Sequence, residues 1–217
     1  MVMLFCDLRD SLHFLNMVDY SFEYAAMKQF GIKYVCGIDE AGRGPWAGPV
    51  VAAAVIFNPN HIPDGLDDSK KLNENQRNRL AIEIKAAALG FSIAFIDAPK
   101  IDEINILQAT MLAMRSTLES LSPEADFALV DGNRMPKLDV PCQTIIKGDG
   151  KSASIAAASI LAKTARDDFM IECHENFPHY GFDKHKGYGV PAHIRALEMH
   201  GPCPLHRFSY KPISKYR

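Results

Sequence analysis

The most informative stretch of this chain reads Gly37-Ile38-Asp39-Glu40-Ala41-Gly42-Arg43-Gly44-Pro45-Trp46-Ala47. Two adjacent carboxylates, Asp39 and Glu40, close a short apolar strand, and they repel each other unless a positive charge holds them. A hard divalent cation is the obvious candidate, because it prefers oxygen ligands. The Gly-Arg-Gly turn that follows gives a neighbouring ligand close access to the backbone, since glycine has no Cβ. Metal ligands beside an exposed backbone loop point to phosphate chemistry.

Strand and helix patterns alternate on either side of this stretch. Apolar runs predict strands over 34–38, 50–57, 91–96, 127–130 and 142–146. Periodicity and capping signals predict helices over 21–30, 73–87, 104–121, 152–176 and 191–200. The 50–57 run is apolar at every position, as expected for a strand covered on both faces. We therefore predict an α/β domain with a mixed sheet, in which the loop 40–49 closes a hairpin.

Size and composition favour a single domain whose cysteines are reduced and which lies outside the membrane. The 217 residues are 47% hydrophobic and carry a formal net charge of −2. The five cysteines are scattered and form no Cys-x-x-Cys pair, which is typical of free thiols. No apolar run approaches the roughly 20 residues that span a bilayer, and the N-terminus lacks a secretion signal. We expect a cytoplasmic protein that has no membrane partner.

The C-terminal segment has a local excess of positive charge. From position 184 onward, Glu198 opposes seven basic residues, namely Lys184, Lys186, Arg195, Arg207, Lys211, Lys215 and Arg217. Such an excess could face a polyanion. A solvated tail explains it equally well, so composition leaves both interpretations open.

Three acids, Asp39, Asp131 and Asp149, follow apolar runs at predicted strand ends. Ligands in open α/β sheets gather beyond strand ends, and neighbouring strands are only about 4.8 Å apart. These acids and Glu40 could therefore converge on one site. Adjacent strand residues point to opposite faces, so either the backbone leaves the pleat at Glu40 or the site is wide enough for two ions. Asp-Gly-Asn turns and Gly-Asp caps are the structural alternative.

Other polar clusters give weaker functional signals. Six histidines crowd the last third of the chain, but their spacing matches no zinc motif, so we interpret them as surface or structural residues. Ser69-Lys70-Lys71 fits a phosphate contact and a solvated loop equally well. The Asp167-Asp168 pair lies within a predicted helix, where we favour an ion pair with Lys163 or Arg166 over catalysis.

Five motifs in fixed order closely resemble bacterial ribonuclease HII, from about residue 34 to 208. They are Asp39-Glu40-Ala41-Gly42-Arg43-Gly44-Pro45, Val130-Asp131-Gly132-Asn133, Lys147-Gly148-Asp149, Ala157-Ala158-Ser159-Ile160-Leu161-Ala162-Lys163 and His185-Lys186-Gly187-Tyr188-Gly189. The resemblance implies an RNase H-like fold, with a five-stranded sheet flanked by helices and a helical C-terminal part. It places residues 31–217 in the catalytic domain and leaves residues 1–30 as an N-terminal extension.

The same resemblance implies a function and a set of site residues. It implies a Mn²⁺- or Mg²⁺-dependent endonuclease that cleaves RNA in RNA–DNA hybrids and single ribonucleotides in duplex DNA, leaving 3′-hydroxyl and 5′-phosphate ends. The implied catalytic and metal-binding residues are Asp39, Glu40, Asp131 and Asp149. The implied 2′-hydroxyl-reading loop is Gly42, Arg43 and Gly44, and the junction-sensing residue is Tyr188. We add Lys147, Lys151, Lys163, Lys184 and Lys186 as candidates for phosphate contacts.

Several alternatives remain at this point. A type III ribonuclease H would carry a larger N-terminal substrate-binding domain than thirty residues can form, and a resolvase-like nuclease could share the fold. A non-catalytic hybrid-binding module would use the acids only as caps. A small-molecule phosphatase fits the basic C-terminal segment less well. We expect a monomer, and the sequence identifies no protein partner.

Overall fold

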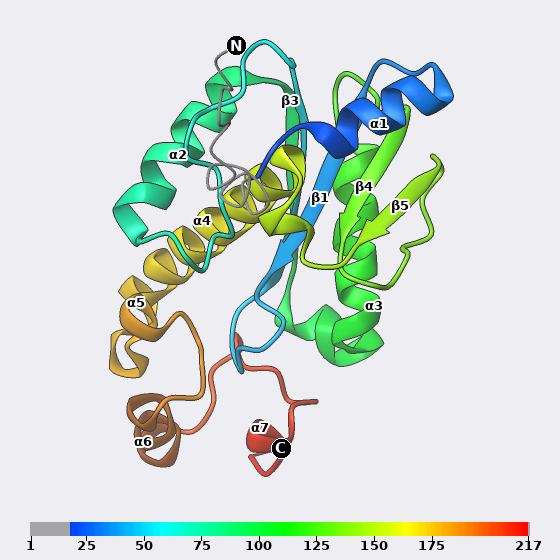
Figure 1. The fold of residues 1–217 in the computed structure, drawn as a ribbon. Helices are drawn as coiled ribbons and strands as arrows, with labels where there is room; N and C mark the ends of the chain where they lie inside the picture. Colours follow the sequence, from blue (N-terminus) through cyan, green and yellow to red (C-terminus); the bar gives the residue numbers. More distant parts are fainter. Residues whose placement is uncertain (1–17, 217) are drawn as a thin grey trace, which may run out of the picture.

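The computed structural model describes residues 18–216, and a mixed five-stranded sheet forms its centre (Figure 1). The strand order is β3-β2-β1-β4-β5. The strands are β1 (Val35–Ala41), β2 (Val50–Phe57), β3 (Ala88–Ile96), β4 (Phe127–Asp131) and β5 (Cys142–Ile145). β2 pairs antiparallel with β1 and β3, whereas β4 pairs parallel with β1 and β5. The predicted mixed sheet and the 40–49 hairpin are confirmed.

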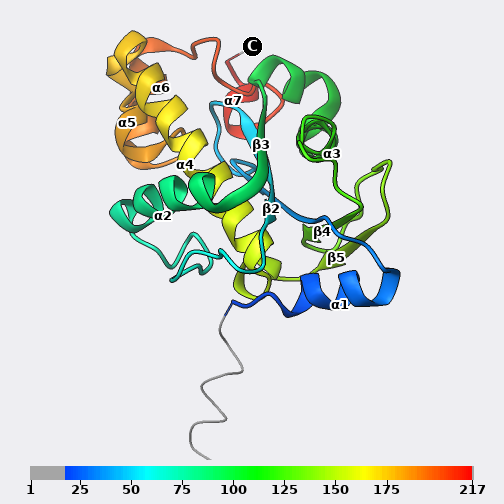
Figure 2. The same cartoon turned by 90° about the horizontal axis from the view of Figure 1, so that it is seen from above.

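Helices cover both faces of the sheet, as the two views show (Figures 1 and 2). The longer ones are α1 (Ser21–Phe30), α2 (Glu74–Ala87), α3 (Ala98–Glu119), α4 (Ala153–Asn176) and α6 (Pro191–His200). The short ones are α5 (Phe182–His185) and α7 (Lys211–Ser214). α2 and α4 pack on one face and α3 on the other. The C-terminal helices lie beyond the end of β1, beside the loop that joins it to β2.

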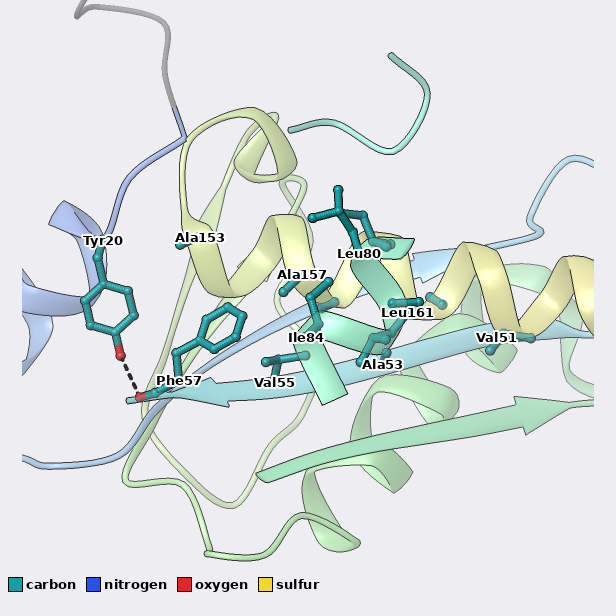
Figure 3. Packing of buried hydrophobic residues seen from close by; sticks show 14 residues of the cluster. Tyr20, Val51, Ala53, Val55, Phe57, Leu80, Ile84, Ala153, Ala157 and Leu161 are labelled. Atoms are coloured by element: carbon teal, nitrogen blue, oxygen red, sulfur yellow. Dashed lines mark hydrogen bonds between the residues drawn. The ribbon is translucent and has the colours of Figure 1, made fainter. Parts of the chain in front are cut away.

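β2 is buried at every position and supplies side chains to both layers. Val51, Val55 and Phe57 pack with α2 and α4 (Figure 3), while Ala54 and Ile56 pack with α3. This alternation follows from the two-residue period of a strand. The run of small residues in α4 lets that helix approach the sheet closely, as expected from the sequence.

The start of α4 approaches the sheet closely at Gly37 of β1. A Cβ at that position would overlap the main chain of Ser154 and Ile155. Ser152 caps the helix by accepting from the N–H of Ile155 at 3.2 Å. Gly37 therefore fixes the distance between β1 and the start of α4.

Several element boundaries differ from the sequence prediction, most of all that of α3, which begins at Ala98 instead of position 104. β1 continues through Ala41 because Glu40 and Ala41 still pair with Ala52 and Val51. β3 begins at Ala88, directly after α2, so the predicted start at position 91 was late. The capping box at Asn73 and Gln76 is confirmed. No described helix combines the length and the apolar character that a bilayer span requires.

Candidate active site

Asp39 and Glu40 lie near the end of β1 and project to opposite faces of the sheet. Both residues keep their ladder partners in β2, so the chain does not leave the pleat at Glu40. Asp39 faces α4 and is buried, and the Ser159 hydroxyl stabilises its charged form. Glu40 faces α3 and lines a hollow beside Asp131. The sequence allowed either a break in the pleat at Glu40 or a wider site. The regular pleat leaves the wider site, which extends across both faces of the sheet.

Asp131 and Asp149 come from the two parallel strands next to β1. Asp131 is the last residue of β4, which pairs with β1 up to Ile38 and Val130. Asp149 lies in the 3₁₀ turn Gly148–Gly150 that follows β5. The N–H of Gly148 donates to Asp131 Oδ1 at 2.6 Å, so this carboxylate and the turn that carries Asp149 are directly joined.

The four carboxylates act on one another electrostatically. Burial raises the pKa of Asp39 well above its ordinary value, and the charges of Glu40 and Asp131 raise it further. Burial and then Asp131 also raise the pKa of Asp149. The pKa of Glu40 is raised by burial, although Arg43, whose Nη1 lies 3.3 Å from Glu40 Oε1, partly offsets this.

This donor set suits a hard divalent cation. Four carboxylates that gather at one end of a sheet supply the oxygen ligands that Mg²⁺ and Mn²⁺ prefer. Burial, and in addition the charge of Asp131, raises the pKa values of Asp39, Glu40 and Asp149, so the charged cluster would gain from a cation. Across residues 18–216, the side chains as placed form no ready-made cage of three or more His, Cys, Asp or Glu ligands. The residues fit a cation in their chemistry and in their location at one end of the sheet.

Lys70 enters the site from the loop before α2. Its Nζ lies 3.5 Å from Asp149 Oδ2 and 3.8 Å from Asp68 Oδ1. Burial works against the ammonium charge, but Asp68, Asp149 and Asp39 together outweigh it and raise the pKa of Lys70. The Lys70 side chain stays 79% exposed while it pairs with Asp149, so a phosphate contact by this segment stays a prediction. No local pattern predicts the pairing of Lys70 with Asp149, because the two residues are 79 positions apart along the chain.

Arg207 lies beneath the glycine-rich loop and is completely buried. Its guanidinium donates to four carbonyl oxygens at 2.7–3.1 Å, those of Gly42, Arg43, Pro45 and Gly48. The hydroxyl of Tyr210 also donates to the Arg43 carbonyl at 2.5 Å. Arg207 therefore neither faces a polyanion nor belongs to a solvated tail, so both interpretations of the basic segment were wrong at this residue. Its five donors instead set the shape of the loop.

Arg166 of α4 does the same for the second half of this loop. It is 1% exposed, and it donates to the carbonyls of Pro49 at 3.0 Å, Ala47 at 3.1 Å and Lys186 at 3.0 Å. Burial and the neighbouring charge of Arg207 lower the pKa of Arg166 to about 10, so the guanidinium stays charged at neutral pH. The Lys186 contact joins the glycine-rich loop to the segment that carries Tyr188.

Tyr188 stands beside the glycine-rich loop. A Cβ added to Gly44 would lie 3.7 Å from Tyr188 Cε1, so the ring flanks this glycine. The N–H of Trp46 donates to the Gly187 carbonyl at 2.9 Å, which ties the two loops together. Tyr188 remains 44% exposed and is therefore accessible to a ligand.

The candidate lysines divide into two groups. Lys163, Lys184 and Lys186 line one hollow with Tyr188. Within it the Lys163 ammonium pairs with Asp167, as expected for this helix, and that of Lys186 donates to the Asp183 carbonyl. Lys147 and Lys151 lie elsewhere, on either side of the turn that carries Asp149. Lys151 Nζ donates to the Ile146 carbonyl at 2.8 Å.

Residues 36–213 match the family model described as Ribonuclease HII. The chain belongs to the ribonuclease HII family. The ribonuclease HII of Dechloromonas aromatica (strain RCB) is 59% identical over 181 residues, which cover 83% of this chain and 92% of that relative. Membership makes the chain a ribonuclease H, an endonuclease, and confirms the resemblance inferred from the five motifs.

Solved structures agree with this family fold. The crystal structure of ribonuclease H2 from Pyrococcus horikoshii OT3 superimposes with a TM-score of 0.72 and 25% identity, and the match covers 85% of this chain and 97% of that one. Bst-RNase HIII, solved in complex with Mn²⁺, superimposes with a TM-score of 0.67. At 20% identity over 88% of this chain and 71% of that chain, the latter supports the fold alone.

The sequence predicted the four acids, which the structure brings to one end of the sheet, but missed the residues that support them. Arg166, Arg207 and Lys70 carry no local pattern that separates them from surface cations. Glu23 of α1, which precedes the matched region, is also fully buried. Its Oε1 accepts from Ser152 Oγ at 2.6 Å and from the N–H of Ser154 at 2.9 Å, so α1 anchors the start of α4.

Proposed function

We propose that this ribonuclease H is a divalent-metal-dependent enzyme that cleaves RNA in RNA–DNA hybrids and also at single ribonucleotides within duplex DNA. Activity on RNA–DNA hybrids follows from membership of the family. The observation that carries the metal-dependent part is the gathering of Asp39, Glu40, Asp131 and Asp149 beside the glycine-rich loop. The products would be a 3′-hydroxyl and a 5′-phosphate.

The four carboxylates would hold Mn²⁺ or Mg²⁺. When bound, such an ion supplies positive charge that activates a water molecule and stabilises the departing 3′-oxygen. Asp39 and Glu40 project to opposite faces, so they are suited to separate positions along the scissile phosphodiester. The charge of Asp131 raises the pKa of each of the other three acids, which makes Asp131 the centre of the cluster.

The glycine-rich loop would read the ribose. The 2′-hydroxyl is what distinguishes RNA from DNA. Arg207 already occupies the carbonyls of Gly42 and Arg43, so the N–H groups of the loop are the better partners for a hydroxyl oxygen. Recognition through the backbone makes no demand on the base. Selectivity for one ribose in any sequence follows naturally from this arrangement.

Tyr188 would rest against the deoxyribose next to that ribose. Its exposed ring flanks Gly44, so the two sugars would occupy neighbouring positions on the protein. An additional 2′-hydroxyl would collide with the ring, which favours a ribose followed by DNA. The lysine-lined hollow beside Tyr188 offers positive charge for the phosphates and predicts salt-sensitive binding.

A cleavage assay tests the proposed function. A labelled duplex with one embedded ribonucleotide is incubated with the protein, with and without MnCl₂ or MgCl₂. We expect a metal-dependent cut at the ribonucleotide, and a loss of at least about 100-fold in rate for Asp131→Asn. Asp126→Asn, the same change at the opposite end of β4, is the matched control and should cut normally.

Three outcomes would contradict the proposal. Binding of the duplex without metal-dependent cleavage would favour the non-catalytic module. Cleavage of continuous hybrids but not of the lone ribonucleotide would favour a specificity of the type III kind. Near-normal turnover of Asp131→Asn would remove this residue from the mechanism.

A further inference from the structure

A buried pair of histidines lies beneath the Tyr188 loop. His193 comes from α6 and His206 from the loop after it, and they are 0% and 1% exposed. Their Nε2 atoms are 2.9 Å apart, close enough for one hydrogen bond. The two rings connect the C-terminal segment to the loop that carries Tyr188.

The contacts of the pair allow only one direction for the hydrogen bonds. The Tyr188 carbonyl can only accept, so His193 Nδ1, 3.0 Å away, carries the proton and His193 Nε2 accepts from His206. His206 Nδ1 lies 2.9 Å from the N–H of Cys203 and 3.2 Å from the Cys203 carbonyl, and the nearer N–H makes this nitrogen the acceptor. A neutral imidazole carries its proton on the other nitrogen, so His206 Nε2–H donates to His193 Nε2.

The surroundings keep both rings neutral. Aromatic side chains enclose the pair, including Trp46, Tyr180 and Phe182. Burial lowers the pKa of His193 and of His206 to about 4. At neutral pH every hydrogen bond in the series Cys203–His206–His193–Tyr188 therefore points in the same direction, towards the Tyr188 carbonyl.

We propose that His193, oriented by His206, is a positioning residue that fixes the backbone of Tyr188 and so sets the selectivity for a ribose–deoxyribose junction. The inference rests on the proposed function of Tyr188. The tyrosine ring is too exposed for packing to hold it, so its place depends on its backbone. That backbone donates to the His185 carbonyl at 2.9 Å, and its carbonyl accepts from His193 and from the N–H of Val190 at 2.9 Å.

The backbone of the Tyr188 loop is also held at the preceding residue, Gly187. Gly187 has φ +85, a region that favours glycine, and its carbonyl accepts from Trp46. A Cβ at Gly187 would also overlap the Ala47 carbonyl. With one side of the loop held in this way, loss of the His193 bond would leave the Tyr188 carbonyl with the N–H of Val190 as its remaining donor and let the ring move relative to Gly44.

Two variants of His193 distinguish the role of its Nδ1 atom from that of its Nε2 atom. In His193→Asn the side-chain amide reaches the Nδ1 position and keeps the donor to Tyr188. In His193→Gln it reaches the Nε2 position, keeps the contact with His206 and loses the one with Tyr188. His193→Asn leaves the buried Nε2–H of His206 without a partner, whereas His193→Gln removes one of the two donors to the Tyr188 carbonyl. The variant that keeps the donor to Tyr188 should therefore be at least as destabilised as the other.

The readout is a ratio of two activities of the full chain with Mn²⁺. It compares kcat/KM on a duplex with one embedded ribonucleotide with kcat/KM on a continuous RNA–DNA hybrid. We expect His193→Asn to keep the ratio of the unchanged protein and His193→Gln to lower it about tenfold, the size of one lost hydrogen bond. A purely structural histidine would change the ratio equally in both variants.

Tyr188→Ala separates failure of this inference from failure of the proposed function. If Tyr188→Ala lowers the ratio but His193→Gln does not, the positioning role is wrong and the role of Tyr188 stands. If Tyr188→Ala leaves the ratio unchanged, both are wrong. Nitrogen NMR of the histidine rings in the unchanged protein gives a test that needs no variant. A proton on His193 Nε2 instead of Nδ1 would overturn the inference.

Discussion

Mild acid should destabilise this protein through His193 and His206. In the folded chain burial lowers the pKa of each to about 4, against an ordinary value of 6.5. Protons therefore bind the unfolded state more readily than the folded one. The resulting stability is fully present above pH 6.5 and is lost as the pH falls towards 4. The titratable groups around the pair are His185, Tyr180 and Cys203, none of which supplies a negative charge at these pH values.

The size of the effect follows from these two pKa values. A difference of about 2.5 corresponds to about 3 kcal/mol for each histidine once the transition is complete. Between pH 7 and pH 5 each histidine should lose about 2 kcal/mol, or about 4 kcal/mol together. For a chain of this length that corresponds to a fall of roughly 8–16 °C in Tm.

Thermal unfolding at pH 7, 6 and 5 measures this loss. In His206→Gln one titrating ring is gone and the other no longer faces a second imidazole, so the fall in Tm should be about half as large. His200→Gln, at an exposed position, is the control and should follow the unchanged protein. The buried carboxylates titrate alike in all three proteins and cancel in the comparison. Parallel curves for the unchanged protein and His206→Gln would refute this reasoning.

Three further substitutions test the support of the site. Gly37→Ala should destabilise the protein by about 3 kcal/mol in chemical denaturation, because its Cβ would overlap the start of α4; a loss under 1 kcal/mol would contradict this packing. Arg207→Lys keeps the charge but loses the fork that holds four carbonyls, so discrimination between ribose and deoxyribose should fall about tenfold in cleavage assays; unchanged discrimination would count against its role. Asp39→Asn should abolish cleavage yet raise the unfolding free energy of the metal-free protein by about 1 kcal/mol or more, because it removes a buried charge that Glu40 and Asp131 repel. A less stable but active Asp39→Asn variant would disprove that account.

Local patterns were sufficient to predict most of the secondary structure. The continuous apolar run of β2, the capping box of α2 and the small-residue face of α4 are properties of neighbouring residues, and the structure confirms each of them. Boundaries were less accurate. β1 extends past Asp39 and Glu40 because β2 offers pairing partners to both, and no local signal reports that pairing.

The sequence by itself determined which acids stand at the ends of strands, because an apolar run followed by a carboxylate is visible in a single segment. Only the tertiary structure decided which cations support the acids and the glycine-rich loop beside them. Arg207 finds the carbonyls of Gly42 and Pro45 more than 160 residues away along the chain, and Lys70 finds Asp149 across 79 residues. A buried charge is tolerated only where the fold brings enough partners to it, and those partners come from segments whose meeting no local pattern encodes. The same holds for His193 and His206, whose pairing exists only because α6 packs against the loop that follows it.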